Sequence, residues 1–228
     1  MTLSRQRKSD LKRRLAEGRD DSRYCAVIGC AQLTTASQGK GLNRLYCRSH
    51  EDHRERHGSY IKRSYTAGQL GPHRAEALRA LHALSKDPLV KQARLGIETL
   101  YATAGAPVDA FRTRGLTPEE RARVTWARLR QSGVDPLEPL AAWLAVVAVI
   151  KADPQPDGRS EFLIVQAGKL IHRLAGGTHK VWQRERPKGG VEVISLHRYP
   201  ASRGRVLRHV GDNLAAVAEP LELMRFPR

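Results

Sequence analysis

The chain has 228 residues, of which 40 are Lys or Arg and 23 are Asp or Glu, so its formal net charge is +17. Hydrophobic residues make up 40% of the sequence, which is enough to build a core in one or two domains. Residues 1–15 are basic without an apolar stretch, and the longest apolar run, 140–150, is well short of the roughly 20 residues that span a bilayer. We therefore expect neither a signal peptide nor a membrane segment.

The N-terminal segment, residues 1–22, is rich in Lys and Arg. Leucines at positions 3, 11 and 15 are spaced among these basic residues, which predicts either a basic helix or an arm that becomes ordered on a partner. We treat this segment as separate from the folded domains that follow it.

Residues 23–66 contain all three cysteines of the chain, Cys25, Cys30 and Cys47, followed by His50. The spacing C-x4-C-x16-C-x2-H provides two thiolates from a short loop and two further ligands from a step that we place at the start of a helix over about 47–57. Zinc binds four Cys or His ligands tetrahedrally, and a shell filled by protein leaves no position for substrate. The pattern predicts one structural Zn²⁺. Reduced thiols as zinc ligands favour a cytoplasmic location, and an odd number of cysteines makes disulfides unlikely.

The segment from Tyr46 to Gly58 resembles the small treble-clef-like zinc modules of phage and mobile-element proteins, some of which lie beside HNH endonucleases. The likeness covers about residues 23–64 and is carried by Tyr46-Cys47-Arg48-Ser49-His50, followed by Arg54, Arg56, His57 and Gly58. It implies that the module handles nucleic acid. The sequence lacks a second His-Asn-His group that would make a nuclease centre.

The positive charge is concentrated in two regions. Residues 1–66 carry 15 basic and 7 acidic residues, residues 178–210 carry 8 and 2, and the long middle segment carries 15 and 11. Two basic regions that flank a nearly balanced one predict contact with a polyanion. Candidate nucleic-acid contacts in the first region are Arg48, Arg54, Arg56, Lys62 and Arg63, with Tyr60 and Tyr65 of the linker available for stacking.

The remainder, residues 67–228, has mainly helical periodicity. We expect Pro72 to open a helix that ends near residue 84, Asp87-Pro88 to cap another, and Thr117-Pro118-Glu119-Glu120 to start a third with a capping box. The segment from about Pro139 to Lys151 is apolar all round and should form the centre of the domain. A further helix, stopped by Gly176-Gly177, precedes the last one, which we place at about 202–218.

Between these last two helices, residues 179–185 and 191–197 are rich in strand-forming residues and predict a β-hairpin. One interpretation is a winged helix, in which the helix before the hairpin enters the major groove of DNA. Its recognition face would carry Gln166, Lys169 and Arg173, and its wing Arg184, Arg186 and Lys188. The alternative is an ordinary helical bundle with a surface hairpin that docks on a protein through Trp182 and Ile194.

Motifs of catalysis are mostly absent, since the sequence contains neither a Walker A loop nor an H-E-x-x-H motif. A second metal bound through His50, His53 and His57 on one helix face is the remaining route to a hydrolase. The favoured function is a zinc-stabilised, non-enzymatic DNA-binding protein, an accessory or regulatory factor of a phage, plasmid or other mobile element that binds double-stranded DNA. The alternatives are an adaptor subunit of a nucleoprotein complex with RNA or protein contacts and, third, a metal-dependent nuclease.

Overall fold

The computed structural model describes residues 23–153, 159–176, 178–185, 189–198 and 204–224. The expected arm at 1–22, the tip residues Arg186 and Lys188 of the hairpin, and the first two residues of the expected last helix lie outside these ranges. The described chain divides into two compact units, Met1–Arg63 and Ser64–Arg228, which we call the N-terminal and C-terminal units. The division falls three residues before the boundary expected from the sequence.

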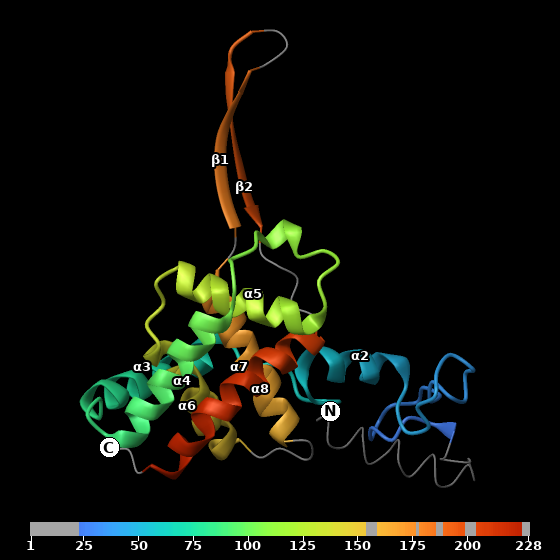
Figure 1. The fold of residues 1–228 in the computed structure, drawn as a ribbon. Coiled ribbons are helices and arrows are strands. Elements are labelled where there is room, and N and C mark those ends of the chain that lie inside the picture. The colour runs from blue at the N-terminus through green and yellow to red at the C-terminus, as the bar shows by residue number, and fades with distance from the viewer. Residues whose placement is uncertain (1–22, 154–158, 177, 186–188, 199–203, 225–228) are drawn as a thin grey trace. The chain divides into compact units, whose positions relative to one another are not determined.

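The structure confirms a mainly helical chain with one antiparallel hairpin and a helix near its C-terminal end (Figure 1). The N-terminal unit contributes α2 (Arg48–His57). The described elements of the C-terminal unit are α3 (Ala67–Ala83), α4 (Pro88–Thr103), η2 (Ala110–Arg112), α5 (Pro118–Gln131), α6 (Leu137–Ala152), α7 (Arg159–Leu174), β1 (Thr178–Glu185), β2 (Val191–Arg198), α8 (Gly204–Ala218) and η3 (Glu219–Leu223). The two short 3-10 helices were not expected. No helix in the described part of the chain is long and apolar enough to cross a bilayer.

Helix starts in the C-terminal unit follow local capping chemistry. The Thr117 hydroxyl accepts a hydrogen bond from the backbone N–H of Glu120, whose carboxylate accepts one from the N–H of Thr117, as the sequence predicted. The prediction that Pro72 opens α3 was wrong. The helix begins five residues earlier, because Thr66 and Gln69 form a second capping box and the helix continues through the proline.

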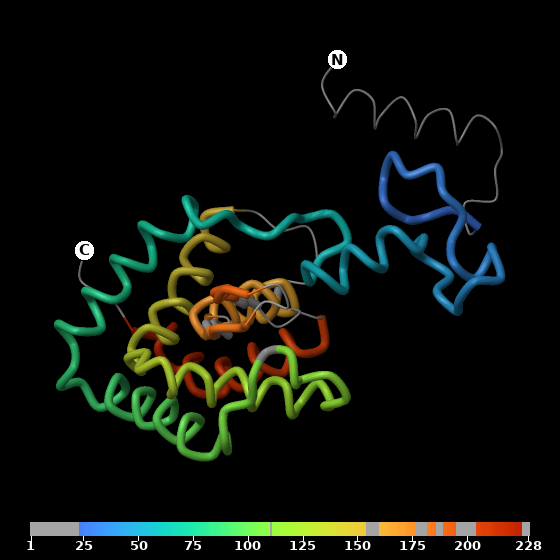
Figure 2. The backbone as a smooth tube through the Cα atoms, turned by 90° about the horizontal axis from the view of Figure 1, so that it is seen from above, coloured from blue at the N-terminus to red at the C-terminus, as the bar shows by residue number. Residues whose placement is uncertain are grey.

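Helix α6 forms the centre of the C-terminal unit and packs against α3, α7 and α8 (Figure 2). Nearly its whole circumference is buried, including Trp143, whose indole N–H donates to Glu222 at 3.0 Å. Helices α7 and α8 cross at closely packed glycines. A Cβ atom added at Gly168 would lie 2.2 Å from the carbonyl oxygen of Leu207, so only glycine fits at this crossing.

The two strands pair in an antiparallel register that places Trp182 opposite Ile194 and Arg184 opposite Glu192. The described side chains on both faces of this ribbon are largely exposed: Trp182 keeps 45% of its surface, Val191 61% and Val193 63%. Figure 1 shows the ribbon extending beyond the helices of the same unit. The two strands therefore form a sheet with no covering layer over these residues.

Candidate metal centre and basic surfaces

Backbone hydrogen bonds shape the loop that carries the first two cysteines. The N–H of Cys25 donates to the carbonyl of Gln32, and the N–H of Cys30 donates to the carbonyl of Val27, which closes a tight turn. Gly29 within this turn has φ 84°, a left-handed conformation that glycine adopts without strain. The turn brings the Cys25 and Cys30 side chains to the same side of the module.

The second pair of ligands lies at the start of α2, where the sequence placed it. The side-chain oxygen of Asn43 accepts hydrogen bonds from the backbone N–H groups of Leu45 and Tyr46, at 2.8 and 3.0 Å, and this fixes the approach to Cys47. Cys47 occupies the N-cap position of α2, and His50 follows in the first turn. At the other end Gly58, with φ 77°, caps the helix through a hydrogen bond to the carbonyl of Arg54.

The four predicted ligands come together, as expected. Their ligand atoms all lie within 4.8 Å of one another. The Nδ1 atom of His50 is 3.3 Å from the sulfur of Cys25 and 3.2 Å from that of Cys47, and the sulfurs of Cys30 and Cys47 are 3.8 Å apart. No disulfide forms among the three cysteines. The group can hold a metal ion, and it is the only such cluster among the described residues.

The electrostatics of the cluster favour a bound cation. Burial raises the pKa of Cys30 to about 12, against a lowering hydrogen bond with the backbone of Gln32 and with smaller raising contributions from Cys25 and Cys47. Burial, followed by the charge of His53, lowers the pKa of His50, which favours the neutral ring that a metal ligand requires. The Cys30 thiol is therefore hard to ionise alone, whereas a divalent cation at the centre of the group would stabilise its thiolate.

The other histidines of α2 have structural contacts. His53 donates from Nδ1 to the carbonyl of Ser59 at 2.7 Å, and its ring stacks on that of His57 with centroids 4.4 Å apart. These contacts lock the turn after α2 against the helix. His53 is therefore not needed as a substitute fourth ligand, because His50 already occupies that place in the cluster.

The predicted basic residues of the N-terminal unit are spread around α2. Arg48 pairs with Asp52 at 3.2 Å and Arg56 bonds the carbonyl of Asp52, whereas Arg54 donates to the hydroxyl of Tyr60 and lies over its ring. All three arginines remain exposed, as does Arg63 of the linker, while Lys62 is half-buried. The sequence analysis overlooked three further exposed basic residues of this unit, which precede the helix: Arg23, Lys40 and Arg44.

The tyrosines expected to stack on bases are already engaged within the protein. Tyr60 stacks on Tyr46, with ring centroids 3.4 Å apart. Tyr65 is 4% exposed and meets Phe162 edge-to-face in the core of the C-terminal unit. Neither ring lies open for a base in this structure, so any contact of the linker with nucleic acid rests on its charges.

The recognition face expected on α7 is largely covered. Gln166 is 2% exposed, and Lys169 is half-buried and donates to the hydroxyl of Ser64. Burial, followed by the neighbouring Arg173, lowers the pKa of Lys169 to about 8. Of the three predicted residues only Arg173 is exposed. The reason is that both α8 and α6 pack on α7, which leaves little of its surface for a groove.

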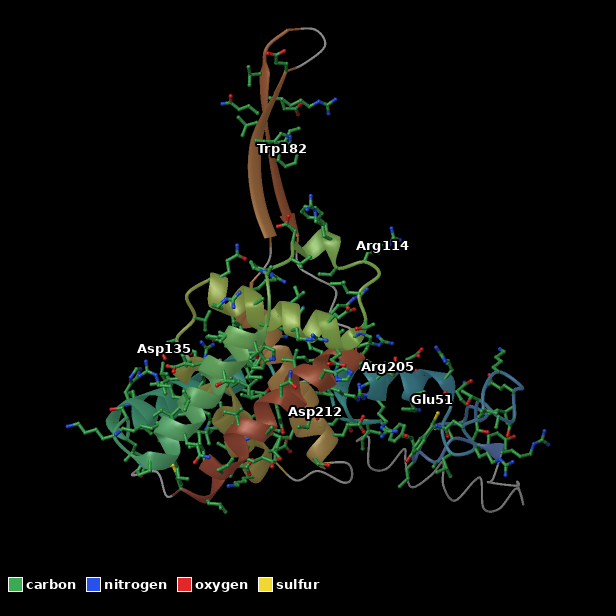
Figure 3. The ribbon with its side chains drawn as sticks, in the orientation of Figure 1. Glu51, Arg114, Asp135, Trp182, Arg205 and Asp212 are labelled. Carbon is green, nitrogen blue, oxygen red and sulfur yellow. The ribbon has the colours of Figure 1, made fainter. Side chains whose placement is uncertain are left out.

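Sequence reasoning named Arg173 and Arg184, but it missed the other members of a set of exposed arginines in the C-terminal unit. They are exposed and form no ion pair with a described residue, unlike Arg74, Arg94, Arg123 and Arg208, which pair with glutamates. Figure 3 labels two of them, one in the loop that follows η2 and one at the start of α8. Together with Arg184 on β1, the set consists of Arg112, Arg114, Arg173, Arg184 and Arg205. We call it the arginine cluster.

Comparisons with protein-family models, with curated proteins and with solved structures found no match to this chain.

Proposed function

We propose that this protein is a zinc-stabilised, non-enzymatic DNA-binding protein. The observation that carries the proposal is the group formed by Cys25, Cys30, Cys47 and His50. Two of its members lie at the start of α2, a short helix with exposed arginines. The resemblance of this segment to the treble-clef-like modules of phage and mobile-element proteins supports a role as an accessory or regulatory factor of such an element.

The donor set and its spacing support zinc as the metal. Three sulfurs and one imidazole nitrogen are the soft and borderline ligands that Zn²⁺ takes in structural sites. With Zn–S bonds of about 2.3 Å, the edge of a tetrahedron between two sulfurs is about 3.8 Å. The distance of 3.8 Å between the sulfurs of Cys30 and Cys47 agrees with that edge. Four protein ligands would leave the metal no open position, which favours a structural role.

The distribution of charge supports nucleic acid as the partner. The N-terminal unit exposes arginines on α2 and in the linker, and the formal charge of the whole chain is +17. Arginines that face solvent beside a rigid, metal-held helix are placed to contact phosphate groups along a duplex. Arg54, Arg56 and Arg63 are the candidates to test first, because they are exposed, whereas Arg48 forms an ion pair with Asp52.

The test is binding of the full chain to labelled duplex DNA, single-stranded DNA and duplex RNA, measured by fluorescence anisotropy at about 50 and 200 mM salt. The zinc content is measured in parallel by elemental analysis of protein purified without chelator. We expect one zinc per chain and salt-dependent binding to duplex DNA. Absence of zinc, or absence of binding to the duplex, would refute the corresponding part of the proposal.

A triple variant locates the contact. R54Q/R56Q/R63Q should reduce the slope of log affinity against log salt by about one unit for each lost phosphate contact, for all DNA sequences alike. The matched control is R79Q/R94Q/R123Q, which removes the same charge from exposed arginines of α3, α4 and α5. Equal losses in the two variants would mean that only net charge matters and that the N-terminal unit is no specific contact.

The same experiment separates the alternatives. An adaptor of a nucleoprotein complex would bind the duplex weakly and prefer RNA or a protein. A nuclease would cleave the labelled DNA when Mg²⁺ or Mn²⁺ is added. The contact of His53 with the carbonyl of Ser59 weighs against a second metal on α2.

A further inference from the structure

We infer that the β1–β2 ribbon, together with the arginine cluster, is a second DNA-contacting surface of the protein, and that the ribbon lies in the major groove of duplex DNA. This inference rests on the proposed function and names the element by which the C-terminal unit takes part in it. It replaces α7, whose predicted recognition face is largely covered.

The exposed apolar side chains of this uncovered two-stranded ribbon indicate that it binds a partner. A two-stranded hairpin is marginally stable in water unless a third strand or a helix covers it. Here Trp182 is exposed on one face, beside the half-buried Ile194, and Val191 and Val193 are exposed on the other. Water-exposed apolar surface of this kind marks an interaction site.

Charge selects the kind of partner. The five members of the arginine cluster are exposed and unpaired with described acidic residues, whereas four other arginines of the same unit have glutamate partners. The connections of the chain bring this charge to the ribbon, since Arg173 precedes β1 by five residues and Arg205 follows β2 by seven. A second copy of the chain would bring like charge to this surface, whereas a polyanion neutralises it.

Dimensions favour the duplex. Eight residues per strand give a ribbon about 26 Å long with strands about 4.8 Å apart. The major groove of B-DNA is about 12 Å wide and admits a two-stranded ribbon, whereas that of A-form RNA is deep, narrow and closed to side chains. The face with Trp182, Arg184 and Ile194 combines a donor for guanine with apolar groups for thymine methyls, and Glu192, opposite Arg184 on the same face, is an acceptor for the amino group of cytosine. We assign this face to the floor of the groove.

The experiment uses the full chain and two variants whose effects differ in kind. R114Q/R205Q removes two charges outside the ribbon and should reduce the salt slope for duplex DNA by about two units and the affinity by about tenfold at the lower salt. W182T/I194T keeps strand-forming residues and all charges. It should weaken duplex binding by about tenfold at both salt concentrations and leave the slope unchanged.

Three controls test the specificity of the charge effect, the groove that is occupied and the folding of each variant. R94Q/R123Q, which removes two arginines that are paired with glutamates, should leave the slope close to that of the wild type. A dye that occupies the major groove should compete with the wild type for the duplex, whereas a minor-groove ligand should not. Circular dichroism must show unchanged helix content in each variant.

The outcomes separate this inference from the proposed function. If R54Q/R56Q/R63Q weakens binding but R114Q/R205Q and W182T/I194T do not, the ribbon is no DNA contact and the proposed function stands. If the wild type binds no duplex, both fail together. Competition by the minor-groove ligand alone, with losses in the ribbon variants, would overturn the assignment to the major groove.

Discussion

The two units of this chain are stabilised by different means. In the N-terminal unit the described buried side chains are chiefly the ligands Cys25 and Cys47 and the hydroxyl residues Thr34 and Thr35, while Leu42 is 97% exposed. In the C-terminal unit the buried side chains are large and apolar, with all-round burial of α6. Forty residues can bury little apolar surface, so we expect a bound metal to stabilise the first unit where the second has a core.

The difference has a practical consequence. All three tryptophans of the chain, Trp126, Trp143 and Trp182, belong to the C-terminal unit, and all the cysteines belong to the N-terminal unit. Tryptophan fluorescence therefore reports the unfolding of one unit, and metal content reports the integrity of the other. Variants can break either unit while the other serves as an internal control.

The largest expected effect is in the N-terminal unit. Cys47→Ser removes a buried ligand, and most of the metal-binding free energy, about 10–16 kcal/mol for structural zinc sites, should be lost with it. We expect hydrogen exchange measured by mass spectrometry to show loss of protection over residues 24–60 and none over α3–α6. The C-terminal unit, followed by tryptophan fluorescence, should unfold at the same temperature as in the wild type. Ser49→Ala, an exposed change on the same helix, should alter neither reading. Retained protection in Cys47→Ser would show that the unit folds without metal.

The complementary variant breaks the C-terminal unit. A Cβ at Gly168 would lie 2.2 Å from the backbone oxygen of Leu207, so Gly168→Ala must push α7 and α8 apart. We expect a loss of about 3 kcal/mol in the free energy of unfolding, measured by tryptophan fluorescence in urea. The metal content should stay at that of the wild type.

A matched glycine tests whether packing is the cause. Gly68 also lies in a helix, but its nearest neighbour to an added Cβ is the Thr66 hydroxyl at 4.0 Å. Gly68→Ala should be neutral or slightly stabilising, because alanine has the higher helix propensity. If Gly68→Ala and Gly168→Ala cost the same, close packing of α7 on α8 is not the reason.

The sequence predicted those features that depend on interactions between residues close together along the chain. The four ligands lie within one short segment, so their spacing sufficed to find them. The capping box at Thr117 and the hairpin over β1 and β2 also depend on near neighbours. The capping box at Thr66 has the same local signature, but the expected start of α3 at Pro72 is five residues too late. Proline is typical of a helix start, whereas Pro72 lies in the second turn of a helix that continues through it.

Features that depend on distant contacts were missed. The helical period marks the apolar side of α7, but it does not show that α8 packs closely at Gly168 or that Gln166, on a different side of the helix, is buried as well. The arginine cluster comes from segments as far apart as Arg112 and Arg205, and its lack of glutamate partners is visible only in the folded chain. No pattern along the sequence carries that information.

The smallest expected effect concerns a single helix end in the C-terminal unit. The carboxylate of Glu120 accepts from the backbone N–H of Thr117 at 2.7 Å and from its hydroxyl at 2.8 Å, and these bonds lower the pKa of Glu120 below its ordinary value of 4.5. A lowered folded pKa stabilises the fold fully above about 4.5, and the contribution is lost as the pH falls through the lower folded value. Glu120→Gln should therefore lower the melting temperature slightly at pH 7, and its difference from the wild type should shrink as the pH falls below about 4.5. Glu119→Gln is the control, because this neighbour in the same turn has Arg123 as its partner and no capping bond. Tryptophan fluorescence makes the measurement independent of metal loss in acid, and equal pH profiles for the two variants would show that the helix dipole, not the capping box, sets the effect.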